Sequence, residues 1–297
     1  MEIREQVSKK VLLISVWSNV LLAVGKCIFG YFGHSNAVFA DGIHSGTDVF
    51  TSIIALFIIK ISNKPADEDH PYGHGKAEIM SSGIVGVLLI IISLYLGYEG
   101  IIGLIQPLET PKAVTLYVAL FSFVFKQFLF RYSLKIAIKY NSKAVEAIAI
   151  DHKADIAASF TAAIGVILFQ VGLHRHIEML LYSDKVASII VAGLIFKMAI
   201  EIIVETIDIL LERNIDGEIL ENLSKIISQF EEVKRIDKIR AREYGHYIIV
   251  DVRIAIDHNR TIKEGHDLAK EIKFTLIEKY TNIEEVLIHF NPYYQES

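Results

Sequence analysis

Six long apolar segments constrain this chain more than any other feature of its sequence. A helix needs roughly 20 apolar residues to cross about 30 Å of hydrocarbon. Segments of that length recur along the 297 residues, separated by short stretches that carry turn residues. They lie near residues 10–32, 36–61, 78–105, 112–135, 143–172 and 184–208. The sequence therefore predicts an all-α six-helix transmembrane bundle.

The C-terminal part of the chain has a different composition. Residues 211–297 hold 30 charged side chains in 87 positions, whereas the 210 residues before them hold 35. This contrast predicts a transmembrane transport domain over residues 1–210 and a soluble domain over residues 211–297.

Periodicity within the soluble part predicts a small α+β domain. Apolar residues have helical spacing over 215–230, and β-branched runs follow over 235–241 and 247–256. Thr261, with a glutamate three residues later, forms a capping box that begins a second helix. A short strand near 286–288 closes the order α-β-β-α-β, which we interpret as a ferredoxin-like two-layer fold.

The distribution of basic residues predicts the orientation in the membrane. The N-terminus and the loops after the second and fourth segments carry 3, 3 and 4 Lys or Arg residues, and the loops on the opposite side carry 0, 1 and 2. Both termini are therefore expected in the cytoplasm, in an integral protein of a bacterial or archaeal cell membrane, with lipid as a partner.

The charge of −5 and the lack of a long basic block argue against nucleic acid as a binding partner. Because Cys27 is the only cysteine, a disulfide framework and a thiolate metal site are excluded.

Ionisable side chains inside the apolar segments point to a metal site. A charge at the centre of a membrane helix costs at least about 2.5 kcal/mol, so such residues usually have a function. His44 and Asp48 lie four apart in the second segment, and Asp151 and Asp155 lie four apart in the fifth. Each pair shares one helix face, and two such faces can close a four-coordinate site between helices. Asp41, one turn before His44, is expected beside this site rather than in it.

Two other interpretations of these residues stay open. The carboxylates can satisfy interhelical hydrogen bonds, or they can form a buried ion pair with Lys153. His152, about 100° around the helix from Asp151, is expected to pack or hydrogen-bond. Lys26 and Lys126 either reach an interface or line the path. Carboxylates gathered in an empty site repel one another, and a divalent cation or protons must relieve that repulsion, which couples metal binding to proton release.

Three stretches together resemble the cation diffusion facilitator family. They are Ala40 to Ser52 (ADGIHSGTDVFTS), Pro65 to Glu78 (PADEDHPYGHGKAE) and the pair Asp151 and Asp155. The resemblance implies a homodimeric secondary transporter, not an enzyme, that exports a divalent metal in exchange for protons by alternating access. The metal is then the substrate, and no cofactor is expected. The resemblance places the family's transport site at His44, Asp48, Asp151 and Asp155.

The resemblance leaves the metal open. Zinc-transporting members commonly have histidine at the place of Asp151, whereas an aspartate pair resembles manganese- or iron-handling relatives. One imidazole with three carboxylates is an oxygen-rich set that suits Mn²⁺ or Fe²⁺ as well as Zn²⁺.

Two further metal positions follow from the resemblance. Asp67, His70 and His74 match a loop-borne site, although a solvated acidic loop is the alternative. In the tail, metal-binding positions match Asp237, Asp251, His266 and His289, with Asn291 beside them. Two of these are aspartates where zinc-binding relatives have histidine, and solvated side chains are the alternative. Lys76 and Glu212 match a charge pair at the cytoplasmic end of the helices.

Two other functions compete with transport. An intramembrane metalloenzyme would hold a catalytic ion at His44 and the aspartates, but the sequence offers neither an adjacent general base nor an HExxH helix. A membrane-anchored metal sensor would use the tail alone, and an anchor does not need three carboxylates in its membrane segments.

Overall fold

A computed structural model describes residues 2–106, 109–140 and 143–294. It contains two compact units. The first comprises residues up to 54 together with 84–202, and the second comprises 55–83 together with 203–297. The second unit thus joins the loop after the second helix, with the helix ends that flank it, to the C-terminal residues.

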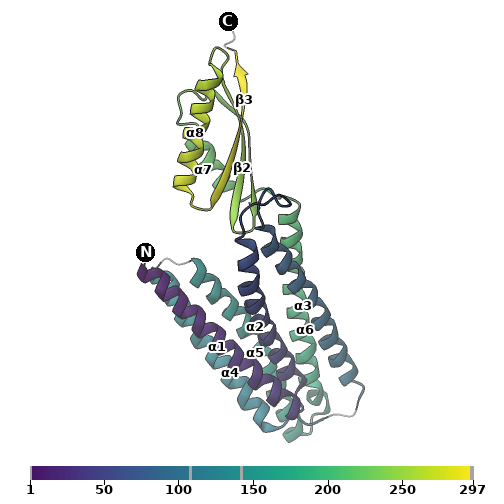
Figure 1. Ribbon diagram of the computed structural model, residues 1–297. Coiled ribbons are helices and arrows are strands. Elements are labelled where there is room, and N and C mark those ends of the chain that lie inside the picture. Colours follow the sequence, from purple (N-terminus) through teal and green to yellow (C-terminus); the bar gives the residue numbers. More distant parts are fainter. Residues whose placement is uncertain (1, 107–108, 141–142, 295–297) are drawn as a thin grey trace. The chain divides into compact units, whose positions relative to one another are not determined.

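Long helices occupy the predicted apolar segments (Figure 1). Their bounds in the described chain are α1 (Glu2–Phe32), α2 (Asn36–Ser62), α3 (Lys76–Gly103), α4 (Ala113–Tyr140), α5 (Lys143–Arg175) and α6 (Ser183–Leu210). A short 3-10 helix, η1 (Glu178–Tyr182), precedes α6. The helices α1 and α5 extend beyond the apolar stretches because polar residues at their ends continue the helical backbone.

Within the described residues, five of these helices have stretches long and apolar enough to cross a membrane. The stretches are Lys10–Phe32, Lys76–Gly103, Ala113–Lys139, Ile148–Arg175 and Glu178–Leu210. Large apolar side chains cover their outer surfaces: Trp17 is 71% exposed and Tyr117 is 69% exposed. Such an extensive apolar surface suits lipid rather than water. The helix α2 is not among the five, so its crossing of the membrane stays a prediction.

Small residues allow the helices of the first unit to pack closely. Ala162 and Ala163 of α5 are buried against Ala37 of α2 and Ala119 of α4. A Cβ atom on Gly42 would lie 2.7 Å from the backbone nitrogen of Cys27, so α1 and α2 meet backbone to backbone. Small side chains are the usual means of close helix packing in membranes.

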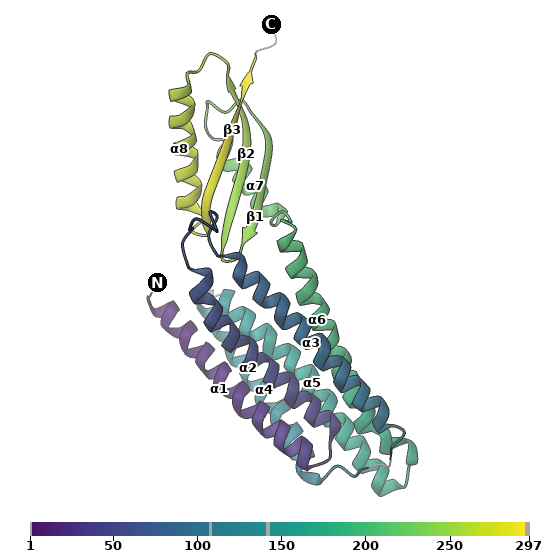
Figure 2. The same ribbon diagram turned by 45° about the vertical axis from the view of Figure 1, so that its right-hand side comes forward.

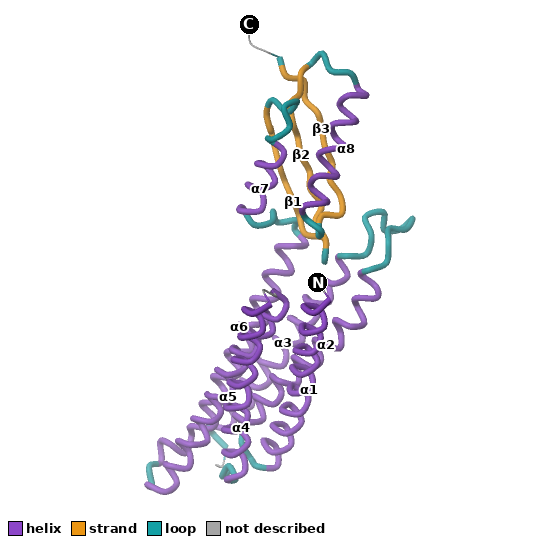
Figure 3. The backbone as a smooth tube through the Cα atoms, turned by 90° about the vertical axis from the view of Figure 1, so that its left-hand side faces the viewer, coloured by secondary structure: helices purple, strands orange, loops and turns teal. Residues whose placement is uncertain are grey.

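The C-terminal part of the second unit has the predicted order α-β-β-α-β. Its elements are α7 (Gly217–Ile227), β1 (Arg235–Tyr244), β2 (Tyr247–Asp257), α8 (Ile262–Lys279) and β3 (Ile283–Tyr293). The sheet order is β1-β2-β3, with β1 antiparallel and β3 parallel to β2. Figure 3 shows the three strands together in one sheet. Gly245, at φ +77°, closes the β1–β2 hairpin with a backbone conformation that glycine adopts readily.

One face of this sheet carries the core. Alternate residues of β2, among them Val250 and Ile254, are buried against Leu223 of α7 and Ile272 of α8. Figure 2 shows α8 running alongside the sheet. This period-two burial is expected for a sheet with helices on one face, and it confirms the two-layer α+β prediction.

The edge strand β1 is strongly charged. Among the described strands it pairs with β2, and an isolated bridge joins its Arg242 to Asn214. Its residues include Arg235, Asp237, Lys238, Arg240 and Arg242. The ladder is irregular between Ile236 and Lys238, where a bulge interrupts the register.

Candidate metal centre

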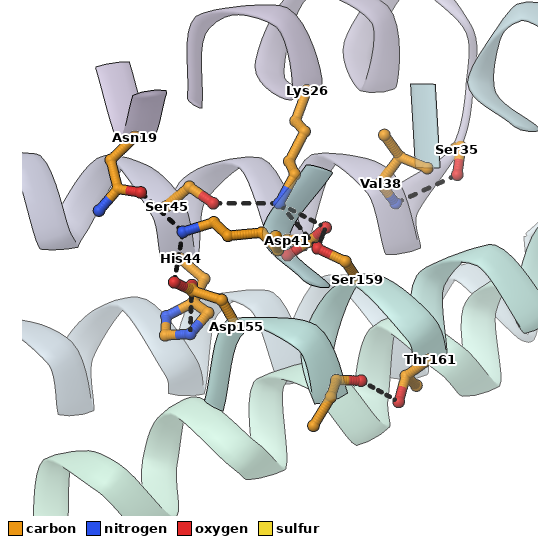
Figure 4. Close-up of polar contacts among 12 residues, drawn as sticks. Asn19, Lys26, Ser35, Val38, Asp41, His44, Ser45, Asp155, Ser159 and Thr161 are labelled. Atoms are coloured by element: carbon orange, nitrogen blue, oxygen red, sulfur yellow. Dashed lines mark hydrogen bonds and ion pairs between the residues drawn. The ribbon is translucent and has the colours of Figure 1, made fainter. Parts of the chain in front are cut away.

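Three of the four predicted transport-site residues converge inside the first unit. His44 and Asp48 extend from α2 and Asp155 from α5, and one ligand atom of each lies within 4.8 Å of the others. His44 Nε2 lies 3.6 Å from Asp155 Oδ1 (Figure 4), and both side chains are buried. One imidazole and two carboxylates at these separations form a set competent to bind a divalent cation. Metal binding by this group stays a prediction.

Asp151 lies outside that group of three. Its side chain is exposed, although it lines the same cavity of about 250 Å³ as His44, Asp48 and Asp155. Four residues along a helix correspond to a rise of about 6 Å, so Asp151 and Asp155 reach one ion only if it lies between their two turns. The structure thus gathers all four residues around one cavity but brings only three into ligand distance.

Buried polar atoms without a partner mark the same place. Among the described residues, His44 Nδ1 and Asp155 Oδ1 are buried and accept or donate no hydrogen bond. His152, expected from the sequence to pack or hydrogen-bond, is also buried, and both its ring nitrogens lack a partner. Its Nδ1 lies 3.9 Å from Asp155 Oδ2. Unsatisfied buried groups are rare in folded proteins and often indicate an ion-binding or functional site.

A lysine from another helix completes the surroundings of Asp155. Lys126 of α4 forms an ion pair with Asp155, and both side chains are buried. The Lys126 ammonium also donates a hydrogen bond to Asn19 Oδ1 at 2.6 Å. Lys153, the buried partner suggested by the sequence, is instead exposed. Asp155 is therefore ion-paired with Lys126 and not with Lys153.

A second buried ion pair holds Asp41. Lys26 Nζ of α1 lies 2.8 Å from Asp41 Oδ2 and donates hydrogen bonds to Ser45 at 3.1 Å and Ser159 at 2.9 Å. The Ser159 hydroxyl donates to Asp41 Oδ2 at 2.8 Å (Figure 4). Asp41 is thus neutralised by its own lysine, in agreement with its predicted place outside the ligand set.

The loop between α2 and α3 brings its three candidate ligands together. The Asp67 carboxylate lies 3.2 Å from His70 Nδ1 and 3.4 Å from His74 Nε2. The backbone N–H of His70 donates to Asp67 at 2.7 Å, and this hydrogen bond holds the pKa of Asp67 below its usual range. Asp67 and His70 are exposed, so this loop group is an open cluster whose metal binding stays a prediction.

Contacts inside the second unit fix this loop. The Tyr247 hydroxyl donates to the Tyr72 carbonyl oxygen at 2.5 Å. Lys76 Nζ lies 3.3 Å from Glu212 Oε1, the charge pair that the resemblance implies, and 5.0 Å from the centre of the Tyr244 ring. The loop is therefore held against the β1–β2 hairpin.

The four tail candidates are not brought together. Asp237 accepts hydrogen bonds from Asn291 Nδ2 at 2.6 Å and from Arg235 Nε at 2.5 Å, and both lower its pKa. Asp251 pairs with Arg242 at 3.5 Å. Candidate metal groups of three or more ligands occur twice among the described residues, and neither includes a tail residue. Asp251 and His289 line one cavity, and metal binding by the tail candidates stays a prediction.

The sequence agrees with known proteins over nearly its whole length. Residues 12–211 match the family model for the cation efflux transmembrane domain, and residues 215–293 match the model for the cytoplasmic domain of cation efflux proteins. The chain is 51% identical over 293 residues to the manganese efflux system protein MneP of Bacillus subtilis, an alignment that covers 99% of each chain.

Two further proteins are similar to this chain. The manganese efflux system protein MneS of Bacillus subtilis is 31% identical over 287 residues, covering 96% of this chain and 95% of that protein. A crystal structure of the cytosolic domain of a cation diffusion facilitator family protein aligns with 25% of this chain and 89% of its own, with 23% identity and a TM-score of 0.24. The matches to both family models and to MneP show that this chain is an integral membrane protein for divalent metal efflux and belongs to the cation diffusion facilitator family.

Proposed function

We propose that this protein exports Mn²⁺ from the cytoplasm in exchange for protons, as a secondary transporter that works by alternating access. The observation that carries the proposal is the convergence of His44, Asp48 and Asp155 in a cavity between membrane helices. In a bilayer such a cluster is costly unless it holds a cation or protons. Asp151, on the wall of the same cavity, is the proposed fourth ligand.

The relatives point to manganese, and the ligand chemistry is compatible with it. Three carboxylates and one imidazole form a hard, oxygen-rich set. Two relatives that align along nearly the whole chain are named manganese efflux proteins. Affinity alone does not select Mn²⁺, because Zn²⁺ binds most mixed sites more tightly. Selectivity then depends on the geometry of the site and on metal availability.

Proton exchange follows from the same electrostatics. Carboxylates that face one another in a membrane cavity need positive charge, and protons supply it when the metal leaves. Metal binding must release those protons, since ligands coordinate in their deprotonated forms. A pH gradient can therefore drive the metal outward.

The architecture that we propose has six membrane spans, with α2 as the second, and a boundary between the two domains near residue 210. Both termini lie in the cytoplasm of a bacterial or archaeal cell. The C-terminal domain, which matches the family's cytoplasmic dimerisation domain, joins two copies into a homodimer. The loop group formed by Asp67, His70 and His74 is a second, weaker metal position.

Flux measurements test this function. The full chain is reconstituted in liposomes that hold a Mn²⁺-sensitive dye, and a pH gradient is applied. We expect gradient-dependent Mn²⁺ uptake that is lost in Asp48→Ala and in Asp155→Ala. Glu201→Gln is the control, because Glu201 is an exposed acid on α6 that pairs with Lys197. Normal transport by both aspartate variants would refute the site, and flux indifferent to pH would refute the exchange.

A further inference from the structure

Lys126 is ion-paired with Asp155, one of the proposed ligands of the transported ion. Its ammonium group binds Asp155 Oδ2, while Asp155 Oδ1 faces His44 Nε2 at 3.6 Å and has no hydrogen-bond partner among the described residues. Lys126 is fully buried, so no solvent separates it from this carboxylate. A metal ion bound between His44 and Asp155 would share the carboxylate with a fixed positive charge.

We propose that Lys126 is a built-in competitor of the metal, which holds Asp155 when the site is empty and gives it up when the ion binds. This inference rests on the proposed function of the cavity. A buried carboxylate without a counter-charge is strongly destabilising, so the empty carrier needs a cation at Asp155. An ammonium group and a divalent cation on one carboxylate repel each other strongly at such short range. Lys126 therefore stabilises the empty site and weakens metal binding.

The structure offers the displaced ammonium a place to go. Lys126 Nζ already donates a hydrogen bond to Asn19 Oδ1 at 2.6 Å, and Asn19 lines the same cavity as the candidate ligands. A shift of the lysine toward Asn19 keeps one hydrogen bond and frees Asp155. The reverse shift restores the ion pair as the metal leaves, which favours release over retention.

Lys26 is a natural comparison within the same unit. It too is fully buried and ion-paired with an aspartate, at 2.8 Å from Asp41. Its partner, however, does not belong to the group formed by His44, Asp48 and Asp155. Removal of Lys26 together with Asp41 should therefore leave metal affinity nearly unchanged, whereas removal of Lys126 should raise it.

Calorimetric titration with Mn²⁺ tests the proposal. The full-length protein is used with His70, His74, His266 and His289 replaced by alanine, so that neither the loop group nor the tail candidates contribute to the titration. We expect Lys126→Met to bind Mn²⁺ at least about tenfold more tightly, because a nearby positive charge is removed from a poorly screened site. We expect the double variant Lys26→Met/Asp41→Asn to keep its affinity within about twofold, because it removes both charges of a neutral ion pair together. Unchanged or weaker binding by folded Lys126→Met would overturn the proposal.

Two additions keep the test decisive. If Lys126→Met does not fold, Lys126→Gln is used instead, because its neutral amide still offers a hydrogen-bond donor beside Asn19. Lys126→Gln should bind Mn²⁺ about tenfold more tightly than the parent protein, and unchanged or weaker binding would contradict the competitor role. Asp48→Asn separates the two hypotheses. If it abolishes binding while Lys126→Met changes nothing, the transport site stands and the competitor falls. If it leaves binding intact, the proposed site itself is wrong.

Discussion

The Tyr247 hydroxyl donates a 2.5 Å hydrogen bond to the carbonyl oxygen of Tyr72, a residue 175 positions earlier in the chain. This bond connects the loop that carries Asp67, His70 and His74 to the β1–β2 hairpin within one compact unit. The loop is thereby held by the sheet as well as by hydrogen bonds between its own residues.

Removal of this hydroxyl should loosen the loop. Tyr247→Phe keeps the ring and loses the hydrogen bond, so we expect local opening of residues 63–76 to become easier by about 1 kcal/mol. Hydrogen exchange followed by mass spectrometry measures this opening. Tyr294→Phe, an exposed tyrosine near the end of the sheet, is the control. Equal exchange of the loop in Tyr247→Phe and in the parent protein would show that the bond is dispensable.

Gly75 should tolerate no side chain. A Cβ atom there would collide with the carbonyl oxygen of Tyr244 and lie 2.8 Å from Cε1 of Tyr247. We expect Gly75→Ala to destabilise the packing of the loop on the hairpin by more than about 1 kcal/mol. Gly217→Ala is a matched control, because a Cβ atom at Gly217 meets nothing within 4 Å. Thermal unfolding and loop exchange compare the two, and equal behaviour would refute the close contact.

Asp67 should titrate with a pKa below the ordinary aspartate value of 3.8. The backbone N–H of His70 binds the ionised carboxylate and lowers its pKa in the folded loop. A depressed folded pKa contributes stability at pH values above the unfolded pKa, and this contribution is lost as the pH falls through the folded value. NMR of protein labelled with ¹³C-carboxyl aspartate measures the midpoint, and Asp67→Asn assigns the signal. A midpoint at or above 3.8 would contradict the hydrogen bond.

Asp151 should set the choice of metal if it is the fourth ligand. Asp151→His replaces a carboxylate on the cavity wall with an imidazole, and we expect the preference for Zn²⁺ over Mn²⁺ to rise by roughly tenfold. Flux of both ions in liposomes gives the ratio. Asp151→Asn, which removes the charge without adding an imidazole, should not shift the ratio toward Zn²⁺. An unchanged profile in Asp151→His would place selectivity elsewhere.

The capping box of α8 should stabilise the C-terminal domain. Thr261 accepts a hydrogen bond from the Glu264 N–H at 3.3 Å, and Glu264 accepts one from the Thr261 N–H at 2.7 Å. We expect Thr261→Ala to cost about 1 kcal/mol. Thr261→Ser keeps the hydroxyl and should retain most of that stability. Exchange of amides in residues 262–279 reports the difference, and similar values for both variants would argue against the cap.

Local spacing predicts the elements of the fold and the faces of the candidate site. Residues four apart on one helix must share a face, so the sequence alone places His44 beside Asp48. The capping box at Thr261 likewise predicts the start of α8. These features depend on neighbours in sequence, which is why periodicity is sufficient to find them.

Pairing between distant helices cannot be predicted in this way. Lys126 and Asp155 are 29 residues apart, and Lys126 and Asn19 are 107 apart. Contact between these residues depends on the relative rotation and axial position of α1, α4 and α5. A local sequence pattern carries no information about that relative placement. Sequence proximity therefore favours Lys153 as the partner of the aspartates, although its side chain is exposed.

The charged strand β1 has a consequence for how copies of this domain can associate. Apart from Ala241, whose backbone binds Asn214 and Ile215, this edge strand offers backbone groups that another strand could extend. A second β1 in antiparallel register would set arginines and lysines opposite one another, and like charges in facing positions repel. Open-ended sheet growth, the first step toward fibrils, is thus opposed by the same side chains that keep the strand soluble. Two copies are then expected to associate through another surface, where the contact can close on itself and stop at two.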